Sequence, residues 1–257
     1  MQSFTPEFKA KPVYNLKKMN KSSDLKLNKT RIEEPIFVIQ QYYQDRNSKR
    51  EKEIQFCLLQ NCLNPLITKI FLLNERIYSK EELGVEDDSK IVQINIKRRL
   101  KYSDVFKTVK KEELKGFIIF CNSDIMFDAT LEKLFFSNLS RRKGLIALTR
   151  YEYKPVTESF EENCKKSKMV MKGHDSQDTW IFHSSFNVKD KSQRKFDFNF
   201  GLPGCDNHIM FLFFSLGYEM FNVPHLIKTH HYHSSNVRHY DESKRIRGGY
   251  SYLHVYR

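Results

Sequence analysis

Three acids and a pair of histidines are the side chains of this sequence best suited to chemistry. Asp124 follows the apolar run FIIF at 117–120, where a buried strand should leave the core. A carboxylate at that point needs solvent or a compensating charge. A divalent cation that also binds substrate phosphates would supply the charge, so we interpret Asp124 as a metal ligand, with a structural turn as the alternative. Asp128 lies close by at the start of the next expected helix, and we predict that it is the helix N-cap.

Three histidines stand near the end of the last apolar segment, in the stretch THHYH. Alternate residues of a strand share a face, so His231 and His233 would point to one side and His230 to the other. Neutral imidazole is a common metal ligand, and the HxH spacing therefore predicts the second part of a metal site. A solvent-exposed strand end is the alternative.

Asp206 follows a glycine- and proline-rich turn in FGLPGCDN and opens a strongly apolar helix. This carboxylate could be the helix N-cap. It could also be a general base that takes the proton of an acceptor hydroxyl. A further acid, Asp178, precedes a strand with the only tryptophan, Trp180. One interpretation of that segment is an Asx-turn before an ordinary strand. The other is one wall of a binding site, in which Gln177 and Asp178 point toward substrate hydroxyls.

Alternating strands and helices must position these side chains. The expected strands cover 36–43, 67–75, 90–96, 116–121, 144–153, 178–186 and 221–233; the expected helices cover 48–63, 102–114, 128–139 and 205–218, with a charged loop at 154–175. This alternation predicts a doubly wound α/β fold with a mostly parallel sheet. Ligands of such folds bind at the carboxyl ends of the strands, which is where Asp124 lies.

Polar residues after the first strand are candidates for binding a nucleotide. Gln40, Gln41 and Tyr42 end that strand, Arg46 follows in the connection to the next helix, and Arg99 precedes the helix at 102–114. The carboxyl end of the first strand would bring them near a bound nucleotide. A polar connection and a surface cation are the alternatives.

Length and composition indicate a globular chain with an anionic partner. The 257 residues carry a net charge of +13, and residues 1–34 lack hydrophobic periodicity. We therefore expect a basic, flexible extension at 1–34 and a single domain at 35–257. Nucleic acid, a membrane surface or a phosphorylated small molecule would suit the charge. No apolar run reaches the roughly 18 residues of a membrane span, and the first residues lack the apolar segment of a secretory signal.

The cysteines point to a reducing compartment. There are five, an odd number, and none has CxxC spacing. This pattern favours reduced, packed thiols over disulfides or a zinc site. We expect a cytoplasmic protein.

The order of these motifs resembles that of the GT-A glycosyltransferases over about residues 35–240. Asn122-Ser123-Asp124 stands where that family has its DxD motif. FGLPGCDN is similar to the loop that opens the base-bearing helix in β-1,4-galactosyltransferases, although Cys205 stands where they have Glu. Together with the stretch SQDTWIF, these motifs are most similar to those of small glycosyltransferase-like proteins of large DNA viruses and some bacteria. If the chain is viral, we expect it in the host cytoplasm.

The resemblance implies a three-layer α/β/α fold and a metal-dependent sugar transfer. The donor would be a UDP- or GDP-linked sugar and the acceptor a hydroxyl of a glycan or protein, with inversion at the sugar carbon. Asp124 with His231 or His233 would hold Mn²⁺ or Mg²⁺, and Asp206 would be the base. The implied donor-site residues also include Asn122 and Ser123, and the implied acceptor-side residues are Gln177, Asp178, Trp180, Gly204 and Asn207.

Two other classes of function are compatible with these residues. A metal-dependent nuclease would use the same acids and histidines, but the sequence has no concentrated aromatic and basic patch for a polynucleotide. A non-catalytic module that binds sugar or nucleic acid would keep the fold, but it would not need both Asp124 and Asp206. We therefore expect no stable complex with nucleic acid, and leave open that the chain forms a homodimer.

Overall fold

The computed structural model describes residues 13–15, 25, 27–170, 177–237 and 241–256. Most of the predicted extension at 1–34 lies outside these residues. The described part of it contacts the domain, because β1 (Val13–Asn15) pairs in parallel with β13 (Tyr250–Tyr252) and the N–H of Ile32 donates to the Phe135 carbonyl at 2.8 Å. The domain boundary at residue 35 stays a prediction.

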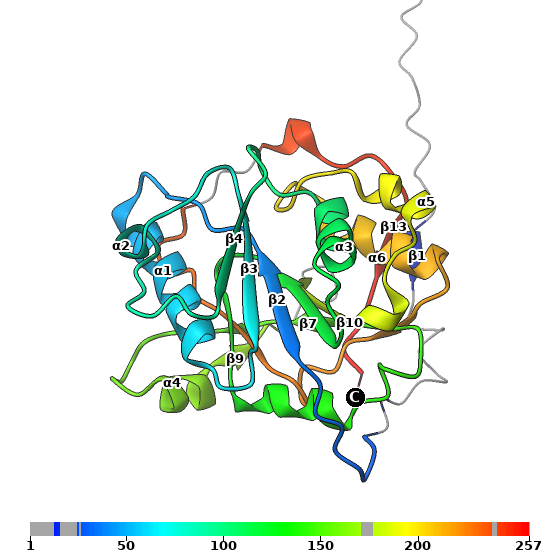
Figure 1. The fold of residues 1–257 in the computed structure, drawn as a ribbon, viewed down its shortest axis with the longest axis horizontal. Coiled ribbons are helices and arrows are strands. Elements are labelled where there is room, and N and C mark those ends of the chain that lie inside the picture. Colours follow the sequence, from blue (N-terminus) through cyan, green and yellow to red (C-terminus); the bar gives the residue numbers. More distant parts are fainter. Residues whose placement is uncertain (1–12, 16–24, 26, 171–176, 238–240, 257) are drawn as a thin grey trace, which may run out of the picture.

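A seven-stranded sheet forms the centre of the molecule (Figure 1). Its strand order is β11 (Glu219–Phe221), β7 (Gly144–Thr149), β10 (Gln177–His183), β5 (Phe117–Cys121), β2 (Ile36–Gln40), β3 (Lys69–Asn74) and β4 (Ile91–Asn95). β10 runs antiparallel to both of its neighbours, and the other pairs are parallel. The predicted mostly parallel sheet is therefore confirmed.

Helices cover both faces of this sheet, which gives the expected three layers. α1 (Ser48–Leu63) and the 3₁₀-helix η3 (Ala129–Phe136) pack on one face, and α3 (Tyr102–Lys111) and α6 (Cys205–Ser215) on the other. β5 is buried along its whole length because it meets both layers. Ile119 packs toward α1, and Phe120 packs toward α3 and α6, as alternating strand residues must.

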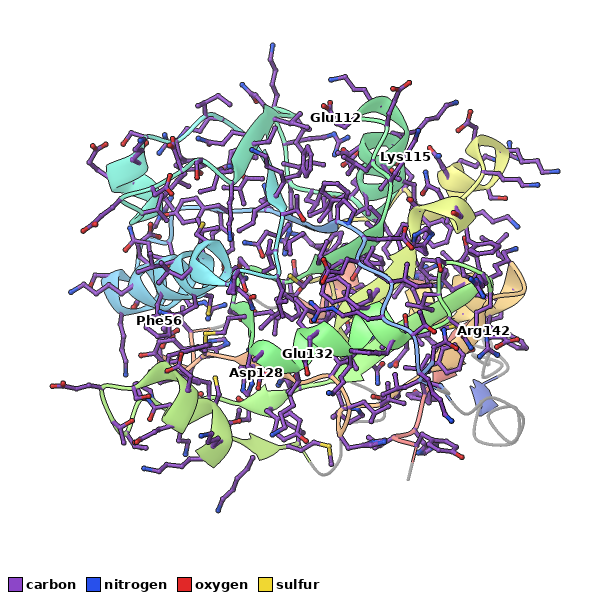
Figure 2. All side chains as sticks on the ribbon, turned by 60° about the horizontal axis from the view of Figure 1, so that its bottom comes forward. Phe56, Glu112, Lys115, Asp128, Glu132 and Arg142 are labelled. Carbon is purple, nitrogen blue, oxygen red and sulfur yellow. The ribbon has the colours of Figure 1, made fainter. Side chains whose placement is uncertain are left out.

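A second, smaller sheet joins segments that are far apart in the sequence. Its order is β6 (Ile125–Phe127), β12 (Thr229–His231), β8 (Tyr151–Glu152) and β9 (Lys168–Met169). His231 pairs with Ile125 on one side and with Glu152 on the other. Phe56, labelled in Figure 2, ties α1 to this part of the fold through ring contacts with Tyr153 and Tyr232 at 5.7 and 5.5 Å.

Several expected elements differ from the structure. The strand predicted over 144–153 breaks after Thr149, so β7 and β8 belong to different sheets, and the helix predicted over 128–139 is the 3₁₀-helix η3. The strand predicted over 221–233 is split into β11 and β12, because Pro224 has no N–H for a ladder and the chain turns after Val223. The predicted loop at 154–175 contains α4 (Phe160–Lys166), which Ser159 caps, and β9; residues 171–175 lie outside the described residues. The other elements are short: α2 (Lys80–Leu83), η5 (Ser184–Phe186), α5 (Asp190–Gln193), η6 (Arg194–Phe196) and η7 (Glu242–Lys244).

The predicted cap at Asp128 is confirmed. Its side chain accepts a hydrogen bond from the Thr130 N–H at 2.9 Å, at the start of η3 (Figure 2).

None of the helices in the described part of the chain has both the length and the apolar character that crossing a membrane takes.

Candidate active site

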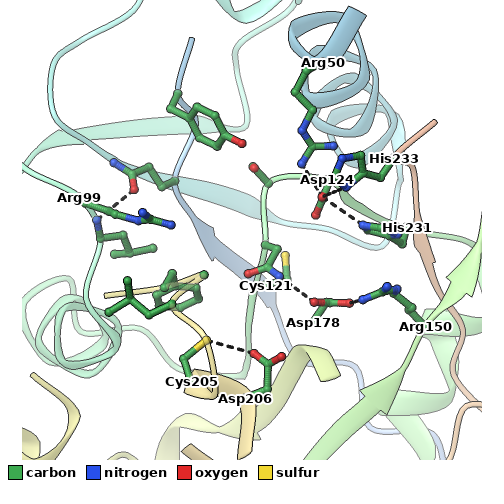
Figure 3. A pocket seen from close by; sticks show the side chains of 18 of the residues that line it. Arg50, Arg99, Cys121, Asp124, Arg150, Asp178, Cys205, Asp206, His231 and His233 are labelled. Atoms are coloured by element: carbon green, nitrogen blue, oxygen red, sulfur yellow. Dashed lines mark hydrogen bonds and ion pairs between the residues drawn. The ribbon is translucent and has the colours of Figure 1, made fainter. Parts of the chain in front are cut away.

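A pocket of about 610 Å³ opens at the carboxyl edge of the central sheet (Figure 3). β2 lies between β5 and β3 in the sheet. The connection that follows β2 leads to β3, away from β5, so a crevice can open between the carboxyl ends of β2 and β5. Ligands of open α/β sheets bind at such a switch point. The volume is in the usual range for a small-molecule site.

Asp124, His231 and His233 form a cluster on one wall of this pocket. One ligand atom from each lies within 4.8 Å of the others. Nε2 of His231 is 3.2 Å and Nδ1 of His233 is 3.8 Å from Oδ2 of Asp124. The sequence predicted all three residues as a metal site, and the fold brings them together across more than a hundred residues of chain.

The small sheet explains how the cluster forms. Asp124 occupies the turn between β5 and β6, and the Tyr232 N–H donates to its carbonyl at 3.0 Å. The predicted strand through His233 is wrong, since β12 ends at His231, but His233 reaches the same carboxylate from the segment that follows. His230 points away, as predicted, with Nε2 3.0 Å from Asp128 and Nδ1 3.0 Å from Ser167 Oγ.

The charges of the cluster are strongly coupled. Burial alone would raise the pKa of Asp124, but His231 and Arg50 outweigh burial and hold that pKa well below its usual range. Burial alone would lower the pKa of His231, but Asp124 and Glu152 raise it to about 9. Burial and the Arg50 charge lower the pKa of His233. The lowered pKa favours the neutral form of His233, the form that binds metals, whereas His231 would release its proton on binding a metal.

These residues fit a divalent cation. Oδ1 of Asp124 is buried and has no hydrogen-bond partner among the described residues, although a buried carboxylate oxygen normally has one. Nδ1 of His231 lies 3.0 Å from Oε2 of Glu152, an arrangement that commonly orients a metal-binding imidazole. One carboxylate and two imidazoles, with open positions for substrate oxygens, suit a divalent transition metal.

Arg50 is the main residue of this wall that the sequence interpretation missed. Its Nη2 lies 2.5 Å from Oδ2 of Asp124, although 74 positions separate the two residues (Figure 3). A signal was available: Arg50 precedes the apolar positions Ile54, Cys57 and Leu58 of α1 by helical spacing, so it lies on the buried face. A charged residue at such a position needs a partner across the core.

A second group of charges lines the pocket beside the cluster. The Asn122 amide donates to Oδ1 of Asp178 at 2.8 Å, and Nη1 of Arg150 lies 2.5 Å from Oδ2 of the same carboxylate. Arg150 also contacts Glu152 at 2.8 Å, which links this group to His231. Asn122, Ser123 and Asp178 line the pocket wall, and their roles in binding stay predictions.

Asp206 lines the same pocket from the first turn of α6. It is not the N-cap, because Gly204 occupies that position with φ of +75°, a conformation that favours glycine. The Cys205 thiol donates to Oδ1 of Asp206 at 3.2 Å, and the Tyr102 hydroxyl donates to the Cys205 sulfur at 3.4 Å. The carboxylate is thus oriented by a chain of buried donors.

The predicted nucleotide residues are only partly on the pocket wall. Gln41 and Arg99 line it, and the Gln41 amide is held by the Leu100 N–H at 3.0 Å and by Glu75 at 3.0 Å. Gln40 and Tyr42 do not line it, because residues on either side of Gln41 face the interior. Gln40 accepts from the Cys121 thiol, and the Tyr42 hydroxyl donates to Glu51.

Other expected positions also need correction. Arg46 is exposed in the turn before α1, away from the pocket wall. Trp180 is fully buried and stacks on Phe120 at 5.3 Å, so it is a core residue. Gln177 is buried and donates to the Leu253 carbonyl at 3.4 Å. Gly204 and Asn207 flank Cys205 and Asp206 but lie outside the lining, because successive helix residues point in different directions.

Besides Arg50 and Arg150, the missed lining residues are Tyr43, Glu75, Leu100, Cys121, Phe200, Gly201, Leu202, Cys205 and Val237. Strand alternation would have found Tyr43, since it shares a face with Gln41.

Comparison with known proteins supports the fold. No protein-family model matches the chain, and no curated protein does. The solved mannosyltransferase PcManGT from Pyrobaculum calidifontis, in complex with GDP-Man and Mn²⁺, is similar with a TM-score of 0.52 at 13% identity, covering 86% of this chain and 63% of that one. GalNAc-T7 with UDP, GalNAc and Mn²⁺ matches with a TM-score of 0.49 at 10% identity, over 80% of this chain and 45% of that one. The chain thus spans less than two thirds of either protein, and at 13% identity the first likeness shows the fold alone: a GT-A glycosyltransferase fold.

Proposed function

We propose that this chain is a metal-dependent glycosyltransferase that moves a sugar from a nucleoside-diphosphate sugar to an acceptor hydroxyl. One observation carries the proposal: a single pocket holds the Asp124, His231 and His233 cluster on one wall and Asp206 on another. The pocket lies at the carboxyl edge of a GT-A sheet, and the similar mannosyltransferase was solved with GDP-Man and Mn²⁺.

Asp124, His231 and His233 would hold Mn²⁺ or Mg²⁺. When bound, the metal would neutralise the negative charge that develops on the departing diphosphate. In this proposal Asn122-Ser123-Asp124 is a DxD-like motif in which only Asp124 is a ligand. Asn122 has a different task, since its amide orients Asp178.

The nucleoside of the UDP- or GDP-linked sugar donor would lie at the opposite end of the pocket. Gln41 and Arg99 line that end, and Figure 3 shows Arg99 across the pocket from His231. The Gln41 amide is already oriented by Leu100 and Glu75, so it would bind without losing side-chain entropy.

Asp206 would be the catalytic base. Its carboxylate would take the proton of the acceptor hydroxyl while the hydroxyl oxygen forms a bond to the anomeric carbon. The bond from that carbon to the diphosphate oxygen breaks, and its electron pair leaves with the diphosphate, which inverts the anomeric centre. Burial raises the pKa of Cys205, so its thiol stays protonated and keeps donating to Asp206.

The acceptor would be a glycan or protein hydroxyl that lies beside Asp206, Asp178 and Phe200. Apolar surface such as Phe200 suits the apolar face of a sugar ring. The five cysteines are free, which supports a reducing, cytoplasmic location. A homodimer, and the likeness to viral and bacterial proteins, stay predictions.

A thermal-shift panel tests this proposal. UDP, GDP, ADP, CDP and a polynucleotide would each be added with and without Mn²⁺. We expect at least one nucleotide to raise the melting temperature only when Mn²⁺ is present, since the metal would bridge the protein and the diphosphate. A flat response to every nucleotide would contradict the proposal, and stabilisation by polynucleotide alone would favour a nuclease.

A further inference from the structure

α1 carries two buried charged residues, Arg50 and Glu53, on the face nearest to the Asp124, His231 and His233 cluster. Their side chains are only 6% and 1% exposed, and Nη1 of Arg50 lies 3.2 Å from Oε2 of Glu53. The two residues are three positions apart and therefore neighbours on the helix surface. Neither belongs to the cluster itself.

Arg50 reaches two of the segments that build the cluster. Its Nη2 donates to Oδ2 of Asp124 at 2.5 Å, and its Nη1 lies 3.4 Å from the Tyr232 carbonyl. Tyr232 stands between His231 and His233, and its N–H in turn donates to the Asp124 carbonyl. One guanidinium thus ties the turn after β5 to the segment that carries the histidines (Figure 3).

Glu53 holds the same histidine segment further along the chain, just after His233. Its carboxylate accepts hydrogen bonds from the Ser234 hydroxyl at 2.9 Å, the Ser235 hydroxyl at 2.7 Å and the Ser235 N–H at 2.6 Å. These residues directly follow His233, which lies beyond the end of β12 and has no sheet ladder to fix it. Glu53 supplies the missing restraint.

Stability is a poor reason for burying such a pair. Removing two charges from water costs as much as their attraction returns, so buried ion pairs seldom stabilise a fold more than apolar residues would. The remaining hydrogen bonds of this pair go to Asp124, Tyr232, Ser234 and Ser235. The pair therefore fixes the positions of the two segments that carry the cluster.

We propose that Arg50 and Glu53 are positioning residues that set the geometry of Asp124 and His233 for the metal ion. The inference rests on the proposed function, because it requires that the cluster binds a metal. Outer partners that orient metal ligands typically contribute about 10–100-fold to metal affinity. Loosening the Glu53 contacts should therefore weaken metal binding before it affects the fold.

Titration with Mn²⁺, followed by the electron paramagnetic resonance signal of the free ion, tests the inference. The variants are Glu53→Ala and the double variant Ser234→Ala/Ser235→Ala, which removes the two hydroxyl donors without leaving a cavity in the core. Leu58→Ala is the control: Leu58 is a fully buried residue of the same helix and packs in the apolar core. It should destabilise the fold by about 2–5 kcal/mol.

We expect the Glu53 variant and the double serine variant to bind Mn²⁺ at least about tenfold more weakly than the wild type. Leu58→Ala should stay within about twofold, because distant sites act independently. Saturating Mn²⁺ should restore donor hydrolysis in the serine variant, which would not happen after general damage to the pocket.

The results separate the inference from the function. Wild-type Mn²⁺ affinity in the folded serine variant would overturn the positioning role while leaving the glycosyltransferase proposal intact. An equal loss of affinity in Leu58→Ala would also overturn it, since the effect would then follow stability. A wild-type chain that binds no Mn²⁺, even with nucleoside diphosphate present, would contradict the proposed function and this inference with it.

Discussion

Nδ1 of His231 lies 3.0 Å from Oε2 of Glu152, and the pairing of β12 with β8 puts the two residues opposite each other. The contact turns Nε2 of the same ring toward Asp124. Burial alone would raise the pKa of Glu152, but the hydrogen bond and charge of His231, together with Arg150, lower it to about 2. Glu152 is therefore an anion that fixes the ring of His231.

Glu152→Ala should weaken Mn²⁺ binding by about 10–100-fold, because the imidazole would lose the partner that orients it. Mn²⁺ titration of the purified variant measures the change. Glu158→Ala is the matched control, since Glu158 is an exposed glutamate in the loop after β8. Equal affinities in the wild type and Glu152→Ala would show that the ring needs no such support.

Asp206→Asn should reduce turnover by about 10²–10⁴-fold, the usual contribution of a general base. An amide can keep the hydrogen bond from Cys205 but cannot take a proton. Binding of the donor should change little, because Asp124 and both histidines remain. Sugar-transfer kinetics and the Mn²⁺-dependent thermal shift measure the two effects separately, and transfer at the wild-type rate would remove Asp206 from the role of base.

Local patterns in the sequence predicted most of the fold. The range predicted for α1 agrees with the structure, because Asn47 caps its first turn and the apolar residues repeat at helical spacing. The β5 strand was evident from its apolar run, and the acid after it from the need for a counter-charge. Both signals lie within a few residues of the feature they predict.

The rest of the site depends on contacts that no local pattern encodes. Arg50 meets Asp124 across 74 positions, and Arg150 meets Asp178 across 28. The strand order decides which charged residues become neighbours in the pocket. Trp180 was misplaced because its side chain packs against Phe120 and Tyr102 in the core, whereas Asp178 of the same strand lines the pocket.

Asp128→Ala should lower the free energy of unfolding by about 1 kcal/mol at neutral pH through loss of the helix cap. Burial alone would raise the pKa of Asp128, but hydrogen bonds with His230 and Thr130 hold that pKa below its usual range. A carboxylate with a lowered pKa stabilises the fold above its unfolded-state pKa, and this contribution is lost as the pH falls through the folded-state pKa. The difference in free energy of unfolding between the wild type and the variant should therefore become smaller at acidic pH.

Urea unfolding of both proteins from neutral pH down to about pH 3 measures that gap. Asp128→Asn is a useful comparison, because an asparagine can still accept from the Thr130 N–H but carries no charge for His230. It should lose less stability than the alanine variant at neutral pH. A gap that is constant with pH would show that the charge of Asp128 contributes nothing.

Trp180→Phe should leave the Mn²⁺-dependent thermal shift of the nucleotides unchanged, because Trp180 is fully buried between Phe120 and Tyr102. Its Nε1 is buried and has no hydrogen-bond partner among the described residues. Phenylalanine removes this unsatisfied donor, worth about 1–3 kcal/mol, which offsets part of the packing that the smaller ring loses. The net loss of stability should stay well under the about 3–5 kcal/mol of a tryptophan-to-alanine truncation.

Phe200→Ala provides the contrast, since Phe200 lines the pocket and should matter for the acceptor while Trp180 should not. The measurements are urea unfolding for stability, the thermal shift with each nucleotide, and the KM for the acceptor. A folded Trp180→Phe protein that no longer responds to nucleotide would mean that Trp180 contacts the donor, and that the pocket extends into what this structure shows as core.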